Sequence, residues 1–326
     1  MGSVMFNPSV KIAFIATLLL FCVVLTATAQ EYEEEVVRVR TDLVTVPAIV
    51  TDAHGRRVFG LRQSDFALKS DNKTLKVDFF SAGTAHVALA FLLDASGSAR
   101  DYLLRQRDTA LSLFARFAPG SRVAVLRFTD TLEIAAPFTS SIELARAGFQ
   151  FPAGANRRTA IIDSALGALH TFDGGTSVQQ ERRIVILTSD GLDTASIKKT
   201  SDVIRQAREQ AISFYVIHFP IFSHRDGRLA PRSPVSGFRE LAEKTGGRYF
   251  MAGNARDALV PKASYDLAPI FKAIEEDLAS QYLLGFYPDE EFRDGRWHRI
   301  GVDVNARMGR KLKITVLREG FLLSKP

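Results

Sequence analysis

The sequence predicts an α/β fold, with a doubly wound, mainly parallel sheet and a small β-sandwich built from the two ends of the chain. Residues 87–93 form a continuous apolar run, as expected of a strand buried on both faces of a sheet that helices cover. Beyond this run, strand-like and helix-like segments alternate, which is typical of a doubly wound sheet. Short segments rich in β-branched residues flank this region on both sides and predict the sandwich.

The first 29 residues have the pattern of a secretory signal peptide. Lys11 precedes an apolar run over residues 12–25, and Ala27-Thr28-Ala29 supplies the small residues of a cleavage site. The run is too short to cross a bilayer comfortably as a helix. We expect cleavage after Ala29, a secreted or periplasmic protein, and no stable membrane span after cleavage. The alternative is that the signal is retained as an anchor.

Residues 30–83 are predicted to supply the N-terminal strands of the sandwich. Residues 36–39 and 75–80 alternate between apolar and polar, and residues 43–50 are rich in β-branched side chains. Turn signals at residues 52–55 and at Asp71-Asn72 separate these segments.

Residues 84–284 are predicted to form the α/β domain. The expected strands are residues 87–93, 123–128, 183–188 and 212–219. The expected helices are residues 100–117, 160–170, 199–210, 238–245 and 266–278. Residues 223–236 are expected to be a loop that is long enough to be functional.

Residues 285–326 return to β structure, with alternation over residues 297–304 and 312–317. Neither terminal set has enough strands for a stable core by itself. We therefore expect the C-terminal strands to join residues 30–83 in one discontinuous sandwich.

Charge and cysteine content exclude several classes of protein. The net charge is +6 and the sequence pI is about 9.5, but the basic residues come in scattered pairs, so no nucleic-acid-binding stripe is present. The single cysteine, Cys22, lies inside the predicted signal peptide. The mature chain therefore has no disulfide, no cysteine zinc site and no thiol nucleophile.

Enzyme signatures are missing from the sequence. It contains no Gly-x-Ser-x-Gly elbow and no Gly-x-x-x-x-Gly-Lys-Ser/Thr loop, and no two of its six histidines form a His-x-x-x-His pair. A phosphatase that uses Asp94 as nucleophile would need a second acid where Ser96 stands. His218 lies in an apolar strand and is expected to be a core histidine with satisfied hydrogen bonds. We predict that the protein is not an enzyme.

Oxygen-bearing side chains follow the buried strand at residues 87–93. Asp94, Ser96 and Ser98 alternate along a tight turn, so their side chains share one side of it, and Gly97 lets the backbone bend. In an open α/β sheet, ligands bind at the carboxyl ends of strands. Carboxylate and hydroxyl oxygens suit Mg²⁺, and also Ca²⁺ or Mn²⁺.

Two further oxygens are predicted at the same edge. Thr159 precedes the helix at residues 160–170, and Asp190 follows the strand at residues 183–188. Each could instead be a helix cap or a turn residue. Because all three loops carry oxygens, we predict a five-residue metal site.

These residues resemble the metal-ion-dependent adhesion site (MIDAS) of von Willebrand factor A (VWFA) domains. The similarity rests on Asp94-x-Ser96-x-Ser98, Thr159 and Ser189-Asp190-Gly191, and it covers residues from about 85 to 260. The flanking segments, such as Gln281–Pro288, resemble the VWFA-related proteins that are abundant in acidobacteria. The resemblance implies a metal-dependent ligand-binding domain, secreted or periplasmic, with no chemistry of its own.

The resemblance also implies a role for each residue. The direct metal ligands would be Ser96, Ser98 and Thr159, while Asp94 and Asp190 would act directly or through water, and a carboxylate of the partner would fill the open position. One departure concerns the threonine, which glycines usually precede in the family but which Arg157 and Arg158 precede here. The two cations could lower metal affinity or favour an acidic partner.

We therefore expect a protein that binds an acidic group of a protein partner through a divalent metal. The sequence leaves the partner and the oligomeric state open. The alternatives are a structural envelope module with a vestigial metal site and, less favoured, a metal-dependent hydrolase.

Overall fold

The structure is a computed structural model of the whole chain. It describes residues 43–83, 86–96, 100–117, 119–150, 158–172, 180–225, 227–254, 266–305 and 311–325. The predicted signal peptide and the strand expected at residues 36–39 lie outside these ranges. Within them, no helix is both long enough and apolar enough to cross a membrane.

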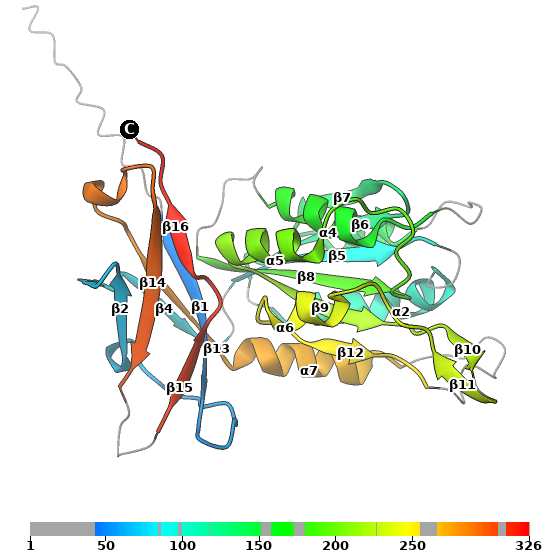
Figure 1. Cartoon of the computed structure of the whole chain (residues 1–326), viewed down its shortest axis with the longest axis horizontal. Helices are drawn as coiled ribbons and strands as arrows, with labels where there is room; N and C mark the ends of the chain where they lie inside the picture. Colours follow the sequence, from blue (N-terminus) through cyan, green and yellow to red (C-terminus); the bar gives the residue numbers. More distant parts are fainter. Residues whose placement is uncertain are drawn as a thin grey trace, which may run out of the picture. The chain divides into compact units, whose positions relative to one another are not determined.

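A six-stranded mixed sheet forms the centre of the α/β region, in the order β12-β9-β8-β5-β6-β7 (Figure 1). The strands are β5 (His86–Asp94), β6 (Arg122–Phe128), β7 (Leu132–Thr139), β8 (Glu181–Ser189), β9 (Ile212–His218) and β12 (Tyr249–Met251). All neighbours pair in parallel except β6 and β7, which are antiparallel. The predicted α/β fold with a mainly parallel sheet is therefore confirmed.

Helices cover both faces of this sheet. They are α2 (Arg100–Phe114), α3 (Ile142–Gly148), α4 (Ile161–His170), α5 (Thr200–Glu209), α6 (Phe238–Glu243) and α7 (Ala268–Ala279). Alternate residues of β5 point to opposite faces, so Leu89 and Phe91 join one apolar cluster with α2, α3 and α7. Ala88 and Ala90 join another with α4, α5 and α6. Burial on both faces explains why β5 is apolar throughout.

Two antiparallel four-stranded sheets contain strands from both ends of the chain. Their orders are β15-β1-β13-β4 and β16-β14-β2-β3. The strands are β1 (Val44–Thr51), β2 (Phe66–Ser70), β3 (Lys73–Leu75), β4 (Phe79–Ala82), β13 (Gln281–Phe286), β14 (Trp297–Val304), β15 (Lys313–Val316) and β16 (Gly320–Leu322). Short 3₁₀ helices lie at Gln63–Asp65 and Glu290–Phe292. Apolar residues of both sheets, among them Val46 and Leu68, belong to one buried cluster.

A β-hairpin occupies part of the segment that the sequence predicts as a loop. Strand β10 (Phe222–Arg225) pairs with β11 (Arg228–Pro231), so the loop prediction is wrong for this part of residues 223–236. The two residues between the strands, Asp226-Gly227, are a common hairpin turn signal.

Candidate metal-binding site

The Asp94 carboxylate lies at the carboxyl end of β5 and is fully buried, at 0% exposure. Its Oδ2 accepts a 2.6 Å hydrogen bond from the hydroxyl of Ser189, the last residue of β8, and its Oδ1 accepts one from the Ser96 N–H at 2.9 Å. The Ser189 oxygen in turn accepts a bond from the Gly191 N–H at 3.1 Å. These bonds hold the carboxylate in one orientation at the sheet edge where parallel strands end, which we call the carboxyl edge.

Burial raises the pKa of Asp94, because a charged carboxylate is poorly solvated there. Hydrogen bonds from Ser189 and Ser96 oppose this effect, and the nearby charge of Asp190 adds to it. A cation at this place would offset both the lost solvation and the repulsion between the two aspartates.

The Ser96 hydroxyl is the most informative group at the site. Its oxygen is buried and makes no hydrogen bond of normal geometry to a described residue, although the hydroxyl lies near the Asp94 carboxylate and helps to lower the pKa of that group. A buried hydroxyl without a partner is unfavourable by about 1–3 kcal/mol. Its position two residues after Asp94 suits a metal ligand, so the described residues fit a bound divalent cation.

Thr159 reaches the carboxyl edge just before α4 and is 6% exposed. Its N–H donates to the Thr194 hydroxyl at 2.9 Å, and its carbonyl accepts from the N–H groups of Thr194 and Ala195 at 2.8 and 3.0 Å. The next N–H, of Ala160, donates to the Thr129 carbonyl at 2.7 Å. Contacts with two other loops therefore fix the backbone of Thr159.

Residues distant in sequence cap the first turn of α4. The N-cap residue of this helix, Ala160, has no side chain that can cap. Instead the Ile162 N–H donates to Asp193 Oδ2 and to the Ser196 hydroxyl, both at 3.0 Å. Sequence reasoning missed Asp193, Thr194 and Ser196, because local spacing gives no signal for a cap supplied from more than 30 positions away.

Asp190 follows β8 and is 6% exposed. Its Oδ1 accepts a hydrogen bond from the Leu192 N–H at 2.9 Å. The next residue has a φ of +80°, and a Cβ there would lie 2.6 Å from the Pro234 Cβ, so this position requires Gly191. The turn thereby places the Asp190 carboxylate close enough to Asp94 to affect its pKa.

His218, at the end of β9, forms a hydrogen bond with the backbone of the Asp190 turn. The Asp190 carbonyl can only accept, so His218 Nε2, at 2.9 Å, carries the proton. In the neutral ring Nδ1 then accepts from the Tyr249 hydroxyl. Burial lowers the pKa of His218, which favours this neutral form. Both ring nitrogens have partners, as expected of a core histidine.

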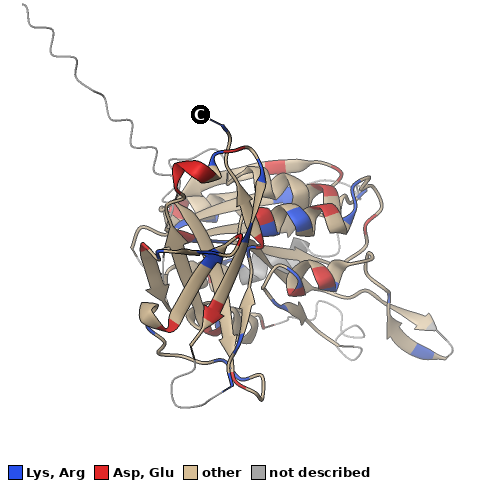
Figure 2. Ribbon diagram, turned by 60° about the vertical axis from the view of Figure 1, so that its left-hand side comes forward, with Lys and Arg blue, Asp and Glu red and all other residues tan. Residues whose placement is uncertain are grey.

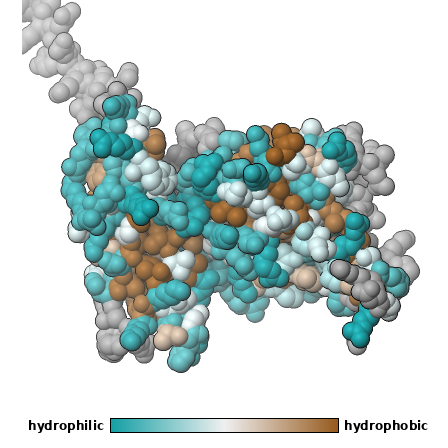
Figure 3. All heavy atoms as spheres, in the orientation of Figure 1, coloured by the Kyte–Doolittle hydropathy of each residue, from teal (hydrophilic) through white to brown (hydrophobic). Residues whose placement is uncertain are grey.

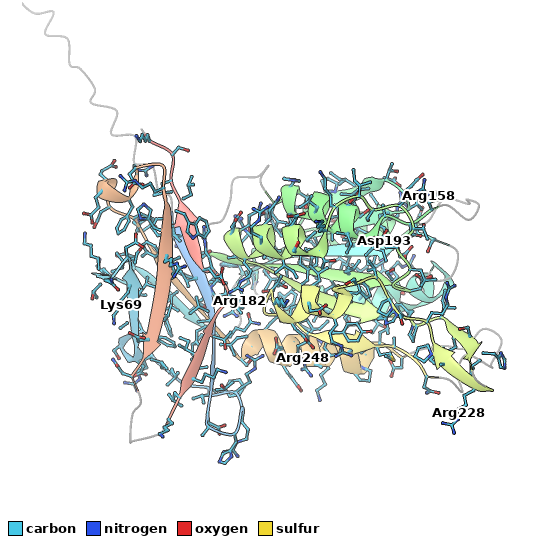
Figure 4. The ribbon with its side chains drawn as sticks, in the orientation of Figure 1. Lys69, Arg158, Arg182, Asp193, Arg228 and Arg248 are labelled. Carbon is cyan, nitrogen blue, oxygen red and sulfur yellow. The ribbon has the colours of Figure 1, made fainter. Side chains whose placement is uncertain are left out.

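The structure thus brings Asp94, Ser96, Thr159 and Asp190 to loops at the carboxyl edge, while Ser98 and Arg157 lie outside the described residues. Arg158 is exposed and donates to the Thr194 carbonyl at 3.0 Å. Figure 4 shows Arg158 and Asp193 at the same end of the central sheet. In the described part of the chain, no group of three or more His, Cys, Asp or Glu side chains could hold a metal.

Several solved structures are similar to the chain at low sequence identity. Solved structures similar to the chain include an aerotolerance-related membrane protein from Bacteroides fragilis NCTC 9343, at 16% identity and a TM-score of 0.42, covering 59% of this chain and 98% of that one. A von Willebrand factor type A protein from Catenulispora acidiphila shows 14% identity and a TM-score of 0.44, with 79% and 74% covered. Proximal thread matrix protein 1 from the mussel byssus, with a zinc-occupied MIDAS motif, shows 17% identity and a TM-score of 0.46, with 63% and 48% covered.

The family is identified by sequence. No curated protein matches the chain. The family model described as von Willebrand factor type A domain matches residues 88–260, which is more than half of the chain and includes most of β5, all of β8 and the loops that carry Asp94, Thr159 and Asp190. The chain therefore belongs to the von Willebrand factor type A domain family.

Proposed function

We propose that the protein binds a partner protein through a divalent metal held by Asp94, Ser96, Ser98, Thr159 and Asp190. Von Willebrand factor type A domains are often metal-dependent protein-interaction modules. The observation that carries the proposal is the buried Ser96 hydroxyl, which makes no hydrogen bond of normal geometry to a described residue, beside a fully buried Asp94 carboxylate at the carboxyl edge. A bound cation would give the Ser96 hydroxyl a partner and would offset the lost solvation of the Asp94 carboxylate.

The donor set favours a hard cation, because every proposed ligand is a hydroxyl or carboxylate oxygen. Mg²⁺ is the ion that we expect, and Ca²⁺ and Mn²⁺ have the same preference for oxygen. When bound, the metal would supply a Lewis-acidic position for an oxygen ligand of the partner.

The residues around the proposed ligands keep them in place. Ser189 orients the Asp94 carboxylate, and Thr194 holds the backbone of Thr159. Gly191 and His218 set the turn that carries Asp190. The site is therefore held on the ends of rigid strands, which limits the reorganisation needed on binding.

A carboxylate is the group that we propose the partner contributes. The chain has a net charge of +6, and exposed Arg158 directly precedes the proposed ligand Thr159. Both features favour an acidic partner.

We further propose a secreted or periplasmic location after cleavage at Ala29, and no enzymatic activity.

We also infer that the two antiparallel sheets form one sandwich, because their apolar residues share a buried cluster. The proposed divisions are the signal peptide (1–29), the N-terminal strands of the sandwich (30–83), the α/β domain (84–284) and the C-terminal strands of the sandwich (285–326). Strand β13 begins at Gln281 and pairs with β1, so the C-terminal strands start a few residues before the last boundary.

Isothermal titration of the purified protein with Mg²⁺ and with Mn²⁺ tests the metal claim. We expect saturable binding to the wild type and its loss in Asp94→Ala. Asp130→Asn is the matched control, since Asp130 is an exposed carboxylate in a loop at the same edge and outside the proposed set. If Asp94→Ala binds as well as the wild type, the site is vestigial, and a structural envelope module is the better description.

A further inference from the structure

The β10–β11 hairpin continues from the carboxyl edge of the central sheet, directly after β9 (Figure 1). Its two strands pair only with each other among the described residues. The Arg232 N–H donates to the Ile221 carbonyl at 2.7 Å, so the ladder extends one step beyond β11 towards the base. The outer edges of such a two-stranded ribbon can pair with a further extended chain.

The segment directly after the hairpin contacts the turn that carries Asp190. The Val235 N–H donates to the Gly191 carbonyl at 2.8 Å, and Pro234 occupies the space that a Cβ on Gly191 would need. Gly191 directly follows Asp190, one of the proposed ligands. The segment that follows the hairpin is therefore in contact with the turn that carries a proposed metal ligand.

Positive charge is concentrated along the hairpin. Arg228 and Arg232 are exposed, and neither forms an ion pair with a described residue. Residues 222–232 contain one acidic residue, Asp226, against three arginines. In Figure 2 the described part of the hairpin carries blue and no red, and Figure 3 shows its outer end as hydrophilic.

The spacing of the two arginines matches an extended ligand. Arg228 follows the turn and Arg232 lies at the base, four positions apart, so both lie on one side of an extended chain. At about 3.3 Å per residue they are roughly 13 Å apart along the strand direction. An extended partner segment would match this with acidic residues four positions apart, each able to accept two hydrogen bonds from a guanidinium group.

We propose that Arg228 and Arg232 of the β10–β11 hairpin bind an extended acidic segment of the partner protein beside the metal. This inference rests on the proposed function, because the metal anchors the carboxylate at one end of the same segment. The hairpin supplies the part of the interaction that does not depend on metal.

Fluorescence anisotropy with a labelled peptide tests the proposal. The probe is an unstructured serine-rich peptide with glutamates four residues apart, and its control has glutamine at those positions. The proteins are the wild type, Arg228→Glu/Arg232→Glu, and Arg299→Glu/Lys313→Glu, each in Mg²⁺ and in EDTA. The last variant makes the same change in net charge at exposed positions of β14 and β15.

We expect the hairpin variant to weaken binding about tenfold or more in Mg²⁺ and in EDTA, and the β14–β15 variant to change it less than about twofold. Equal losses in both variants would mean that net charge alone is responsible, and would overturn the proposal. So would a wild type that binds the glutamate and glutamine peptides equally. Asp94→Ala separates the two claims, because it removes only the Mg²⁺-dependent part of binding if the proposed function holds.

Discussion

The Ser189 hydroxyl donates a 2.6 Å hydrogen bond to Oδ2 of Asp94, and this bond joins the carboxyl ends of β8 and β5. Both residues are fully buried. The carboxylate that the sequence places at the centre of the site is thus oriented by the neighbouring parallel strand, and its position does not depend on its own turn alone.

Replacing Ser189 by Ala leaves the buried Asp94 carboxylate without this donor. We expect the free energy of unfolding in EDTA to fall by about 1–3 kcal/mol, as measured by urea denaturation. Thr188→Val is the matched control, because the Thr188 hydroxyl is buried on the same strand and makes no hydrogen bond to a described residue. The control should be neutral or slightly stabilising, and equal losses in both variants would contradict the role of the Ser189 bond.

Tyr249→Phe removes the hydroxyl that donates to His218 Nδ1. The ring nitrogen is then a buried acceptor without a partner, at a cost of about 1–3 kcal/mol. We also expect weaker Mg²⁺ binding in a calorimetric titration, because His218 holds the Asp190 carbonyl. Tyr287→Phe is the control, since Tyr287 is 46% exposed. An unchanged metal affinity in Tyr249→Phe would show that His218 does not position Asp190.

The antiparallel sheets contain a pH-dependent contact at His298. Burial opposes a charge on this ring, but hydrogen bonds to Asp71 at 2.7 Å and to Asp294 at 3.1 Å outweigh it and raise the pKa of His298 above 6.5. The hydrogen bond from His298 lowers the pKa of Asp71 below 3.8. For Asp294 the Arg296 N–H is the largest cause of a lowered pKa, with His298 contributing.

The sign of the effect follows from these directions. A raised histidine pKa contributes stability that is complete below about pH 6.5 and is lost as the pH rises through the folded value. Lowered aspartate pKa values contribute stability above about pH 3.9, which is lost as the pH falls. Urea denaturation at about pH 5.5 and about pH 8.5 should therefore show a smaller loss of stability with rising pH in His298→Gln than in the wild type. Identical slopes would rule out this contribution.

A buried charge cluster connects α7 to its surroundings through Asp277. Its Oδ1 accepts from Arg57 at 2.5 Å and its Oδ2 from the Tyr215 hydroxyl at 2.8 Å. Nearby Arg182 donates to the Leu278 carbonyl at 3.0 Å, and burial lowers its pKa to about 10. Among the described residues, Asp277 is the carboxylate that balances the charge of buried Arg182 and half-buried Arg57.

Asp277→Asn should lower the free energy of unfolding by about 3 kcal/mol or more, because it leaves buried positive charge unbalanced. Asp303→Asn is the control, since its ion pair with Lys69 is exposed on both sides. Exposed pairs contribute about 0–1 kcal/mol. Urea denaturation of both variants measures the difference, and comparable small losses would show that the Asp277 contacts do not carry the expected energy.

The sequence predicts the central strands because burial on both faces imposes apolar runs such as Val87–Leu93. It misses β7, which contains Pro137 and is an edge strand, where proline is tolerated. It also misses β12 and β16, which have only three residues each and show too little alternation to detect.

At the site, the motif order predicts that Asp94 and Asp190 lie at one edge, because each stands at or just after the carboxyl end of a parallel strand. Thr159 reaches the same edge just before helix α4. The contacts that orient them are between distant segments, such as Ser189 with Asp94 and Thr194 with Thr159. Such partners depend on how the loops meet in three dimensions, and no local spacing encodes them.

Thermal unfolding of the wild type in EDTA and in excess Mg²⁺ tests the central claim most directly. A ligand that binds only the native state stabilises it by about 2.7 kcal/mol at a hundredfold excess over its Kd. We predict a higher Tm in Mg²⁺ for the wild type and for Asp130→Asn, and no shift for Asp94→Ala. A wild-type Tm that is the same in EDTA and in millimolar Mg²⁺, Ca²⁺ and Mn²⁺ would contradict the metal site at Asp94, Ser96, Ser98, Thr159 and Asp190.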